Sequence, residues 1–168
     1  LAFCFLLITV GHLQGQPVET LIKKAGMDMM QAFLQKDYDK FLSYMDPGLV
    51  KLAGGRDSLL QKIDTASKIA SRFGAKVTRI TIGNPYKVVD YKGQLQATLP
   101  ETTEMSFFNG KIELETTLIA LSDDQGKHWH FIDTHLYSME SLRKNLPGLS
   151  PDLIIPPPKK PVFTAREE

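Results

Sequence analysis

The segment from His128 to Tyr137 holds most of the residues that could do chemistry. His128 and His130 are two positions apart, so on a β-strand they share a face, where two imidazoles can bind one zinc ion. His135 has the opposite parity and joins them only through a β-bulge, and Asp133 shares the parity of His135. We predict no metal site and interpret this as an exposed strand face on which neutral imidazoles flank Trp129. The pair His128 and His130 remains the candidate if a metal is bound.

Four carboxylates lie around the Asn109-Gly110 dipeptide, at Glu101, Glu104, Glu113 and Glu115. A glycosidase pair needs a cleft and a defined separation, and nothing in the spacing indicates either. We therefore interpret these residues as a solvated, charged sheet face. The sequence has no Gly-x-Ser-x-Gly elbow for a nucleophile, and Gly54-Gly55 lacks the spacing of a phosphate-binding loop. No cofactor is predicted.

Composition favours a single globular domain. The chain has 168 residues, of which 42% are hydrophobic and 23% are charged, which is enough to build one core. The formal net charge of +1 gives no broad field for nucleic acid or for an anionic membrane, so neither partner is expected.

The first ten residues are almost wholly apolar, and a polar, glycine-containing segment follows them. This pattern is typical of a signal peptide, and we predict that residues 1–15 form part of one, cleaved near Gly15. The mature protein would then be secreted or periplasmic. It would have no thiol, because Cys4 is the one cysteine of the chain. A buried N-terminal strand and a lipid-modified Cys4 are the alternatives.

Helical periodicity dominates the chain up to Phe73. Apolar residues from Val18 to Phe33 recur at helical spacing, and a shorter helix follows Asp37 and stops at Asp46-Pro47-Gly48. Residues 49–52 read as a brief extended piece. A third helix is predicted over 56–73, with Ser58 and Gln61 as a capping box and Gly74 as its left-handed stop.

Strand patterns follow, at 76–82, 86–91, 94–99, 101–108, 111–121 and 128–137. Asn109-Gly110 predicts a two-residue type I′ hairpin, and the short links predict antiparallel pairing. Residues 138–145 fit a short helix. The proline-rich remainder is interpreted as a tail strapped across the domain, with a ligand for an aromatic-lined groove as the alternative.

The order of elements resembles the nuclear transport factor 2-like, or cystatin-like, superfamily of α+β cones over roughly residues 18–137. The residues that carry this resemblance are the long first helix, the Asp37-Tyr38-Asp39-Lys40-Phe41 start of the second, Gly54-Gly55-Arg56 before the third, and the segment from Gly126 to Asp133. The superfamily includes ketosteroid isomerase-like enzymes, polyketide cyclases, dehydratases and many exported proteins with no known activity. Fold alone does not select among them.

The resemblance implies N-terminal helices packed on a strongly curved antiparallel sheet that forms a cone, with a cavity between them. The domain would span residues 16–138, and residues 139–168 would pack on it as a short helix and tail. Asp133 is the candidate catalytic carboxylate, and burial inside the cone would raise its pKa. The predicted pocket residues are Tyr38, Tyr44, Met105, Phe107, Trp129, Phe131, Asp133 and His135.

Two functions remain open on the sequence. One is an exported, non-catalytic domain that binds a small apolar ligand or a protein partner, and the other is an isomerase, cyclase or dehydratase acting in the cone. Methionine and phenylalanine side chains are numerous enough to fill such a cavity, which would remove the pocket. A homodimer through the outer sheet face is also expected by analogy. The alternating residues Thr116, Leu118 and Ala120 would form its interface.

Overall fold

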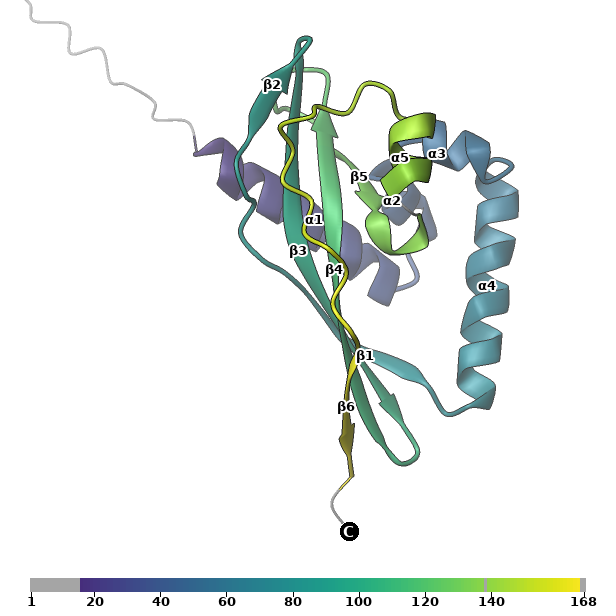
Figure 1. Cartoon of the computed structure of the whole chain (residues 1–168). Coiled ribbons are helices and arrows are strands. Elements are labelled where there is room, and N and C mark those ends of the chain that lie inside the picture. The colour runs from purple at the N-terminus through teal and green to yellow at the C-terminus, as the bar shows by residue number, and fades with distance from the viewer. Residues whose placement is uncertain (1–15, 138, 167–168) are drawn as a thin grey trace, which may run out of the picture.

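The computed structural model describes residues 16–137 and 139–166 of the chain. It has an α+β fold in which four helices precede an antiparallel sheet, so the predicted fold class is confirmed at this level (Figure 1). The predicted signal peptide and Cys4 lie outside the described residues. Within the described ranges, no helix combines the length and apolar character needed to cross a bilayer.

The N-terminal helices are α1 (Val18–Leu34), α2 (Tyr38–Ser43), α3 (Pro47–Leu52) and α4 (Arg56–Arg72). The Asp37 side chain caps α2 by accepting a hydrogen bond from the Lys40 amide. The extended piece predicted at 49–52 is wrong, because the Asp46 carboxylate accepts from the Leu49 amide at 2.9 Å and starts α3. Pro47 suits the first turn of α3, because amides at that position have no acceptor within the helix and its missing N–H therefore costs no hydrogen bond.

Helix α4 ends at Arg72, and Gly74 is the predicted left-handed stop, with a φ of 68°. The Ala75 amide then bonds back to the Ala70 carbonyl at 3.0 Å. The predicted capping box is wrong, because the Ser58 hydroxyl donates to the Ala53 carbonyl and Gly55 occupies the cap position.

The sheet has the strand order β1-β3-β4-β5, with β2 added beside β3 and β6 beside β4. The strands are β1 (Lys76–Ile82), β2 (Val89–Tyr91), β3 (Gln94–Phe107), β4 (Gly110–Ser122), β5 (His130–Asp133) and β6 (Val162–Ala165). Every pairing of these strands is antiparallel. Strand β3 passes through Pro100 without a break, and the Pro100 carbonyl accepts a hydrogen bond from the Gly83 amide at 2.8 Å.

The hairpin between β3 and β4 is confirmed, but its predicted turn type is wrong. Phe107 pairs with Gly110, so the two central residues are Phe108 and Asn109, and neither has a positive φ. A two-residue hairpin turn with positive φ at both positions instead joins β2 to β3, at Lys92 (55°) and Gly93 (83°).

The sheet is covered on both faces. On the inner face, Ile22 and Met29 of α1 pack with Leu99, Leu118 and Phe131. On the outer face, a second core gathers side chains from the sheet, α3, the short helix α5 (Met139–Asn145) and the following segment, among them Leu49, Ile119, Ile132, Leu142, Leu149 and Leu153.

The residue series offered for a dimer interface does not lie on an exposed face. Leu118 and Ala120 are both 0% exposed and belong to the inner core with the α1 side chains. A strand's alternate residues point to opposite faces, and here the parity of Leu118 is the inner one. The series is therefore wrong as an outer surface.

The chain after α5 runs along the sheet, as the yellow end of the ribbon makes visible (Figure 1). Gln96, 0% exposed, donates to the Gly148 carbonyl at 2.8 Å and accepts from the Ser150 amide at 2.8 Å. Thr98 donates to the Ile154 carbonyl. The segment ends in β6, a strand that the sequence pattern does not predict.

The last strand of the predicted meander is shorter than expected. It ends at Asp133, whose carboxylate accepts a hydrogen bond from the His135 amide at 2.8 Å and starts a 3-10 turn, η1 (Thr134–Leu136). Strand parity therefore stops at Asp133. His135 and Tyr137 do not continue the face on which Phe131 lies.

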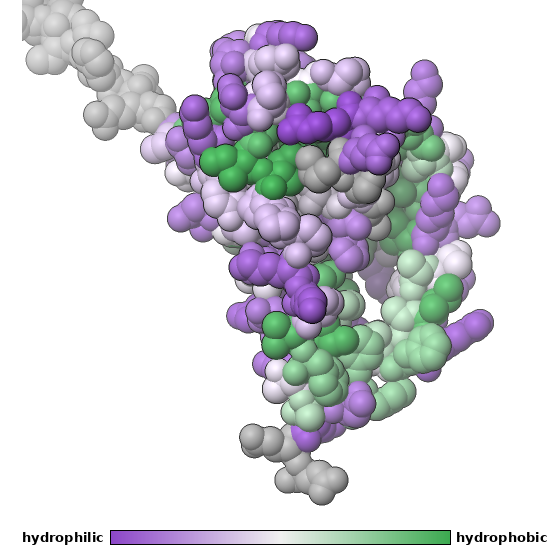
Figure 2. Space-filling view, viewed as in Figure 1, coloured by the Kyte–Doolittle hydropathy of each residue, from purple (hydrophilic) through white to green (hydrophobic). Residues whose placement is uncertain are grey.

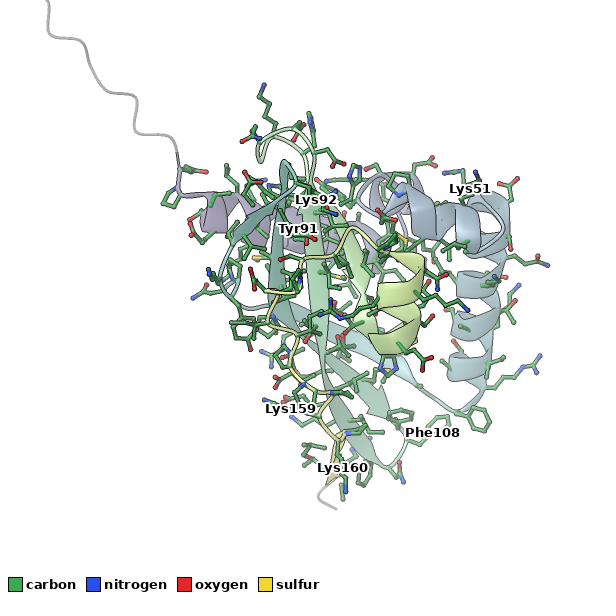
Figure 3. The ribbon with its side chains drawn as sticks, turned by 45° about the horizontal axis from the view of Figure 1, so that its top comes forward. Lys51, Tyr91, Lys92, Phe108, Lys159 and Lys160 are labelled. Carbon is green, nitrogen blue, oxygen red and sulfur yellow. The ribbon has the colours of Figure 1, made fainter. Side chains whose placement is uncertain are left out.

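Apolar side chains are exposed at the end of the molecule where the β3–β4 hairpin and β6 lie (Figure 2). Phe108, at the hairpin turn, is 78% exposed and points toward the end of α4 (Figure 3). A Cβ on Gly74 would lie 2.5 Å from the Phe108 ring, so this ring packs directly on the glycine. The contact joins the last turn of α4 to the hairpin.

Candidate functional site

A cavity of about 300 Å³ lies between the helices and the inner face of the sheet; we call it the inner cavity. Its walls are almost entirely apolar. The helices contribute Met29, Met30, Phe33, Phe41, Leu59 and Ile63, the segment between α2 and α3 contributes Met45, and the sheet contributes Val77, Ile80, Thr103, Leu118 and Phe131. Two carboxyl groups, Glu101 and Asp133, complete the lining.

Helix α4 leaves the cavity open because it does not pack fully on the sheet. None of its side chains is completely buried. Leu59 and Ile63 are one turn apart on the same face, and both are half-buried and line the cavity. The apolar face of α4 is therefore directed at a space that the methionines and phenylalanines of the chain leave unfilled.

Glu101 is the most unusual residue of the inner cavity. It lies in the middle of β3 and is 5% exposed. One carboxyl oxygen, Oε1, accepts a hydrogen bond from the Thr103 hydroxyl at 3.2 Å. The other, Oε2, is buried and has no hydrogen-bond partner among the described residues. Unpaired buried oxygens are rare in folded proteins, so this one calls for an explanation.

The surroundings raise the pKa of Glu101 from 4.5 to about 7. Burial is the main cause, since it removes water from the charged form. The negative charge of Asp133 raises this pKa further, and the hydrogen bond from Thr103 opposes both effects. Glu101 is therefore divided between its acid and carboxylate forms near neutral pH.

Asp133 lies at the end of β5, opposite Leu118 of β4. Burial raises the pKa of Asp133, while the hydrogen bond from the His135 amide and the charge of His135 lower it. Asp133 thus has the partner that Glu101 Oε2 lacks. The cavity combines one hydrogen-bonded carboxyl group with one whose second oxygen is unpaired among the described residues.

The predicted pocket residues separate into several places. Phe131 and Asp133 line the inner cavity. Tyr44 and Trp129 line a more polar groove between α1 and the loop that precedes β5. The remaining four, Tyr38, Met105, Phe107 and His135, line neither; Met105 and Phe107 have the inner parity on β3 but lie further toward the hairpin.

His128, His130 and His135 are not brought together as a group of three metal ligands. His128 precedes β5, and its Nδ1 lies 2.5 Å from the Asp124 carboxylate. Hydrogen bonds from the His128 backbone and side chain hold the pKa of Asp124 well below its usual range. Within residues 16–137 and 139–166, no group of three His, Cys, Asp or Glu side chains is placed to hold a metal ion.

Glu101 does not belong to the solvated face that the sequence predicts. This interpretation is wrong for Glu101 because the residue is buried. Its neighbour Glu104 has the opposite parity and forms ion pairs with Arg79 and Lys111. The available signal was parity, because Glu101 alternates with Ala97, Leu99, Met105 and Phe107 once β3 is read as one strand through Pro100.

Comparisons with known proteins add no further constraint. No family model, no curated protein and no solved structure matches the chain. The resemblance to the nuclear transport factor 2-like superfamily therefore stays a prediction, and the function must be argued from the site.

Proposed function

We propose that this chain is a non-catalytic binding domain of the cone type, whose inner cavity takes a small, largely apolar molecule that carries a hydrogen-bond donor. The observation that carries the proposal is the buried Oε2 of Glu101, which has no partner among the described residues. A ligand donor beside this oxygen would supply the missing hydrogen bond. The apolar walls would hold the rest of the ligand.

Energetics support a ligand in this position. Leaving a buried acceptor without a hydrogen bond costs about 1–3 kcal/mol, and more for a charged group. A protein whose cavity is never occupied has no compensation for this cost, whereas a binding protein recovers it in the complex. The cavity volume of about 300 Å³ is at the lower end of the range usual for ligand sites.

The size limits the ligand to roughly ten non-hydrogen atoms, if each takes about the 30 Å³ of one water molecule. A suitable probe is 2-phenylethanol, which has an apolar ring and one hydroxyl donor. We expect it to shift the NMR signals of methyl groups on Met29, Leu59 and Ile63, which line the cavity. Signals from the exposed end of the molecule should stay in place.

A matched pair of substitutions on α4 tests the location. Ile63→Phe places a larger side chain in the cavity wall and should abolish binding of the probe. Ile69→Phe makes the same change at a position that is 50% exposed, and should leave binding unchanged. Equal binding of the probe by the two variants would overturn the proposal.

A second candidate is an enzyme that moves a proton within the cavity, as the resemblance to isomerases, cyclases and dehydratases suggests. The pKa of Glu101, about 7, favours this candidate because a general acid–base works best near the operating pH. A carboxylate there could take a proton from a carbon next to a ketone and return it. The test is deuterium exchange from D₂O into 4-phenyl-2-butanone, which should require Glu101 and follow its titration. Deuterium exchange no faster than in buffer would rule out this enzyme and leave ligand binding as the proposed function.

Export is part of the proposal, because the apolar run at residues 1–10 is typical of the core of a signal peptide. Expression of the full precursor in a bacterial host tests it. The protein should be recovered from the periplasm or the medium with a new N-terminus near Gln16. Recovery of the uncleaved chain from the cytoplasm contradicts export without affecting the cavity.

A further inference from the structure

We propose that the ligand of the inner cavity is an amphipathic amine, bound as its ammonium ion by the carboxylates of Glu101 and Asp133. This inference rests on the proposed binding function and names the chemical class of the ligand. It follows from the two carboxyl groups that line the cavity and from the lack of a basic side chain in the described lining.

Among the described residues, the cavity lining has two carboxyl groups and includes no lysine, arginine or histidine. Arg79 of β1 and Lys111 of β4 are paired with Glu104, whose side chain has the opposite parity to Glu101 on β3. Nothing in the described lining therefore offsets the negative charge of the cavity.

Electrostatics distinguish a cation from a neutral donor. Glu101 and Asp133 lie on the strands that flank β4, and the charge of Asp133 disfavours the carboxylate form of Glu101. A hydroxyl group on a ligand would satisfy Glu101 Oε2 but would leave this repulsion in place. An ammonium ion would satisfy the same oxygen and also neutralise the repulsion between the two carboxylates.

The donor count of the ligand also fits. An ammonium group has three N–H donors and no acceptor, so it matches a site that offers carboxyl oxygens alone as its charged groups. Hydrogen bonds between ionised partners are about twice as strong as neutral ones. Asp133 already accepts from the His135 amide and keeps a second oxygen, while Glu101 keeps Oε2.

The remaining walls suit the apolar body of such an amine. The ring centroids of Phe33 and Phe41 lie 5.2 Å apart, and the two ring planes are tilted by 52° relative to each other. Both rings and that of Phe131 line the cavity, and aromatic faces attract cations. The unbranched side chains of Met29, Met30 and Met45 can adapt to ligands of different shape.

The test compares two probes that differ only in the donor, 2-phenylethylamine and 2-phenylethanol, at pH 8 by calorimetry or NMR titration. We expect the amine to bind at least about tenfold more tightly than the alcohol. Equal affinity for the two probes, or tighter binding of the alcohol, overturns the amine while leaving the binding function intact. Failure of both probes to bind overturns both proposals.

Two substitutions assign the preference to the carboxyl groups. Glu101→Gln should reduce the affinity for the amine about tenfold and that for the alcohol by less than about twofold. Asp133→Asn keeps the oxygen that accepts from the His135 amide and should also weaken amine binding selectively. Glu113→Gln, at an exposed position on β4, is the control and should change neither affinity. A preference for the amine that survives both cavity substitutions contradicts the assignment.

Proton linkage gives an independent readout in the wild-type protein. The titratable groups at the site are Glu101 and Asp133, with His135 acting on Asp133. Because an ammonium ion favours the carboxylate form of Glu101, amine binding should release protons near neutral pH and tighten as the pH rises from about 5.5 to 8. Binding of the alcohol should lack this increase. An amine affinity that is constant over this range contradicts ion pairing with Glu101.

Discussion

Glu101 and Asp133 line one cavity from the two strands that flank β4, and the charge of Asp133 raises the pKa of Glu101. Neither residue is close to the other in the sequence. The antiparallel register places Glu101 opposite Thr116 and Asp133 opposite Leu118, two positions along the same face of β4.

The first prediction concerns how the unfolding free energy depends on pH. The folded pKa of Glu101 is about 7 against an ordinary value of 4.5, so between these values the folded state holds a proton that the unfolded chain has lost. Stability must therefore fall as the pH rises through this window. Relative to Glu101→Gln, the wild type should lose on the order of 3 kcal/mol of unfolding free energy, measured by urea denaturation from about pH 4.5 to pH 8.

The control for this measurement is Glu113→Gln, which removes an exposed carboxylate from the neighbouring strand. It should keep the wild-type pH dependence. Parallel stability curves for the wild type and Glu101→Gln would mean that Glu101 titrates as an exposed residue does, contrary to its burial.

The second prediction concerns the coupling between the two carboxyl groups. Asp133→Asn removes the negative charge but keeps an oxygen that can accept from the His135 amide. The pKa of Glu101 should then fall, because one cause of its rise is gone while burial remains. The ¹³C chemical shift of the Glu101 carboxyl group, followed against pH, measures this. An unchanged midpoint in Asp133→Asn would place the two groups too far apart to interact.

One member of this pair could be anticipated from the sequence and the other could not, for a definite reason. Asp133 follows Trp129 and Phe131 in alternation, so its apolar surroundings are expected. Glu101 follows Pro100, which separates two predicted strands, and this break hides its parity with Leu99. Pro100 is tolerated there because its carbonyl serves Gly83 while its ring nitrogen needs no partner.

Strand β6 could not be predicted from its own residues. Val162–Ala165 is exposed throughout, so it has no alternation of buried and solvated positions. Its pairing with β4 depends on the course of the preceding segment. Gln96 and Thr98, which are far from that segment in the sequence, hold it in place through hydrogen bonds. Local patterns contain no information about such contacts, whereas α1 and α4 carry their own periodicity.

The third prediction tests this attachment. Gln96→Leu leaves the buried Ser150 amide and the carbonyl of the more exposed Gly148 without their side-chain partner. The unfolding free energy should fall by about 2–4 kcal/mol, with roughly 1–3 kcal/mol for the unpaired Ser150 amide and about 1 kcal/mol for the hydrogen bond lost by the Gly148 carbonyl. Trypsin should also cut faster after Lys159. Thr98→Val removes a single bond to the Ile154 carbonyl and should cost only about 1 kcal/mol. Equal effects of the two substitutions would contradict the central role of Gln96.

The fourth prediction compares two glycines that face different constraints. Gly93 has a φ of 83°, and a Cβ added there would meet open space, so Gly93→Ala should cost about 1 kcal/mol of backbone strain and leave the rest of the sheet unchanged. A Cβ on Gly110 would lie 2.3 Å from the Thr164 carbonyl oxygen and 2.8 Å from the Phe163 ring. Gly110→Ala should therefore displace β6 from β4.

Amide hydrogen exchange separates these two outcomes. In Gly110→Ala, exchange should accelerate in residues 162–165 and in the paired segment Gly110 to Glu113, because the ladder between them opens. In Gly93→Ala, faster exchange should be confined to the turn between β2 and β3. Retained protection of residues 162–165 in Gly110→Ala would mean that β6 adjusts to the extra methyl group. The close approach at Gly110 would then not be what positions the end of the chain.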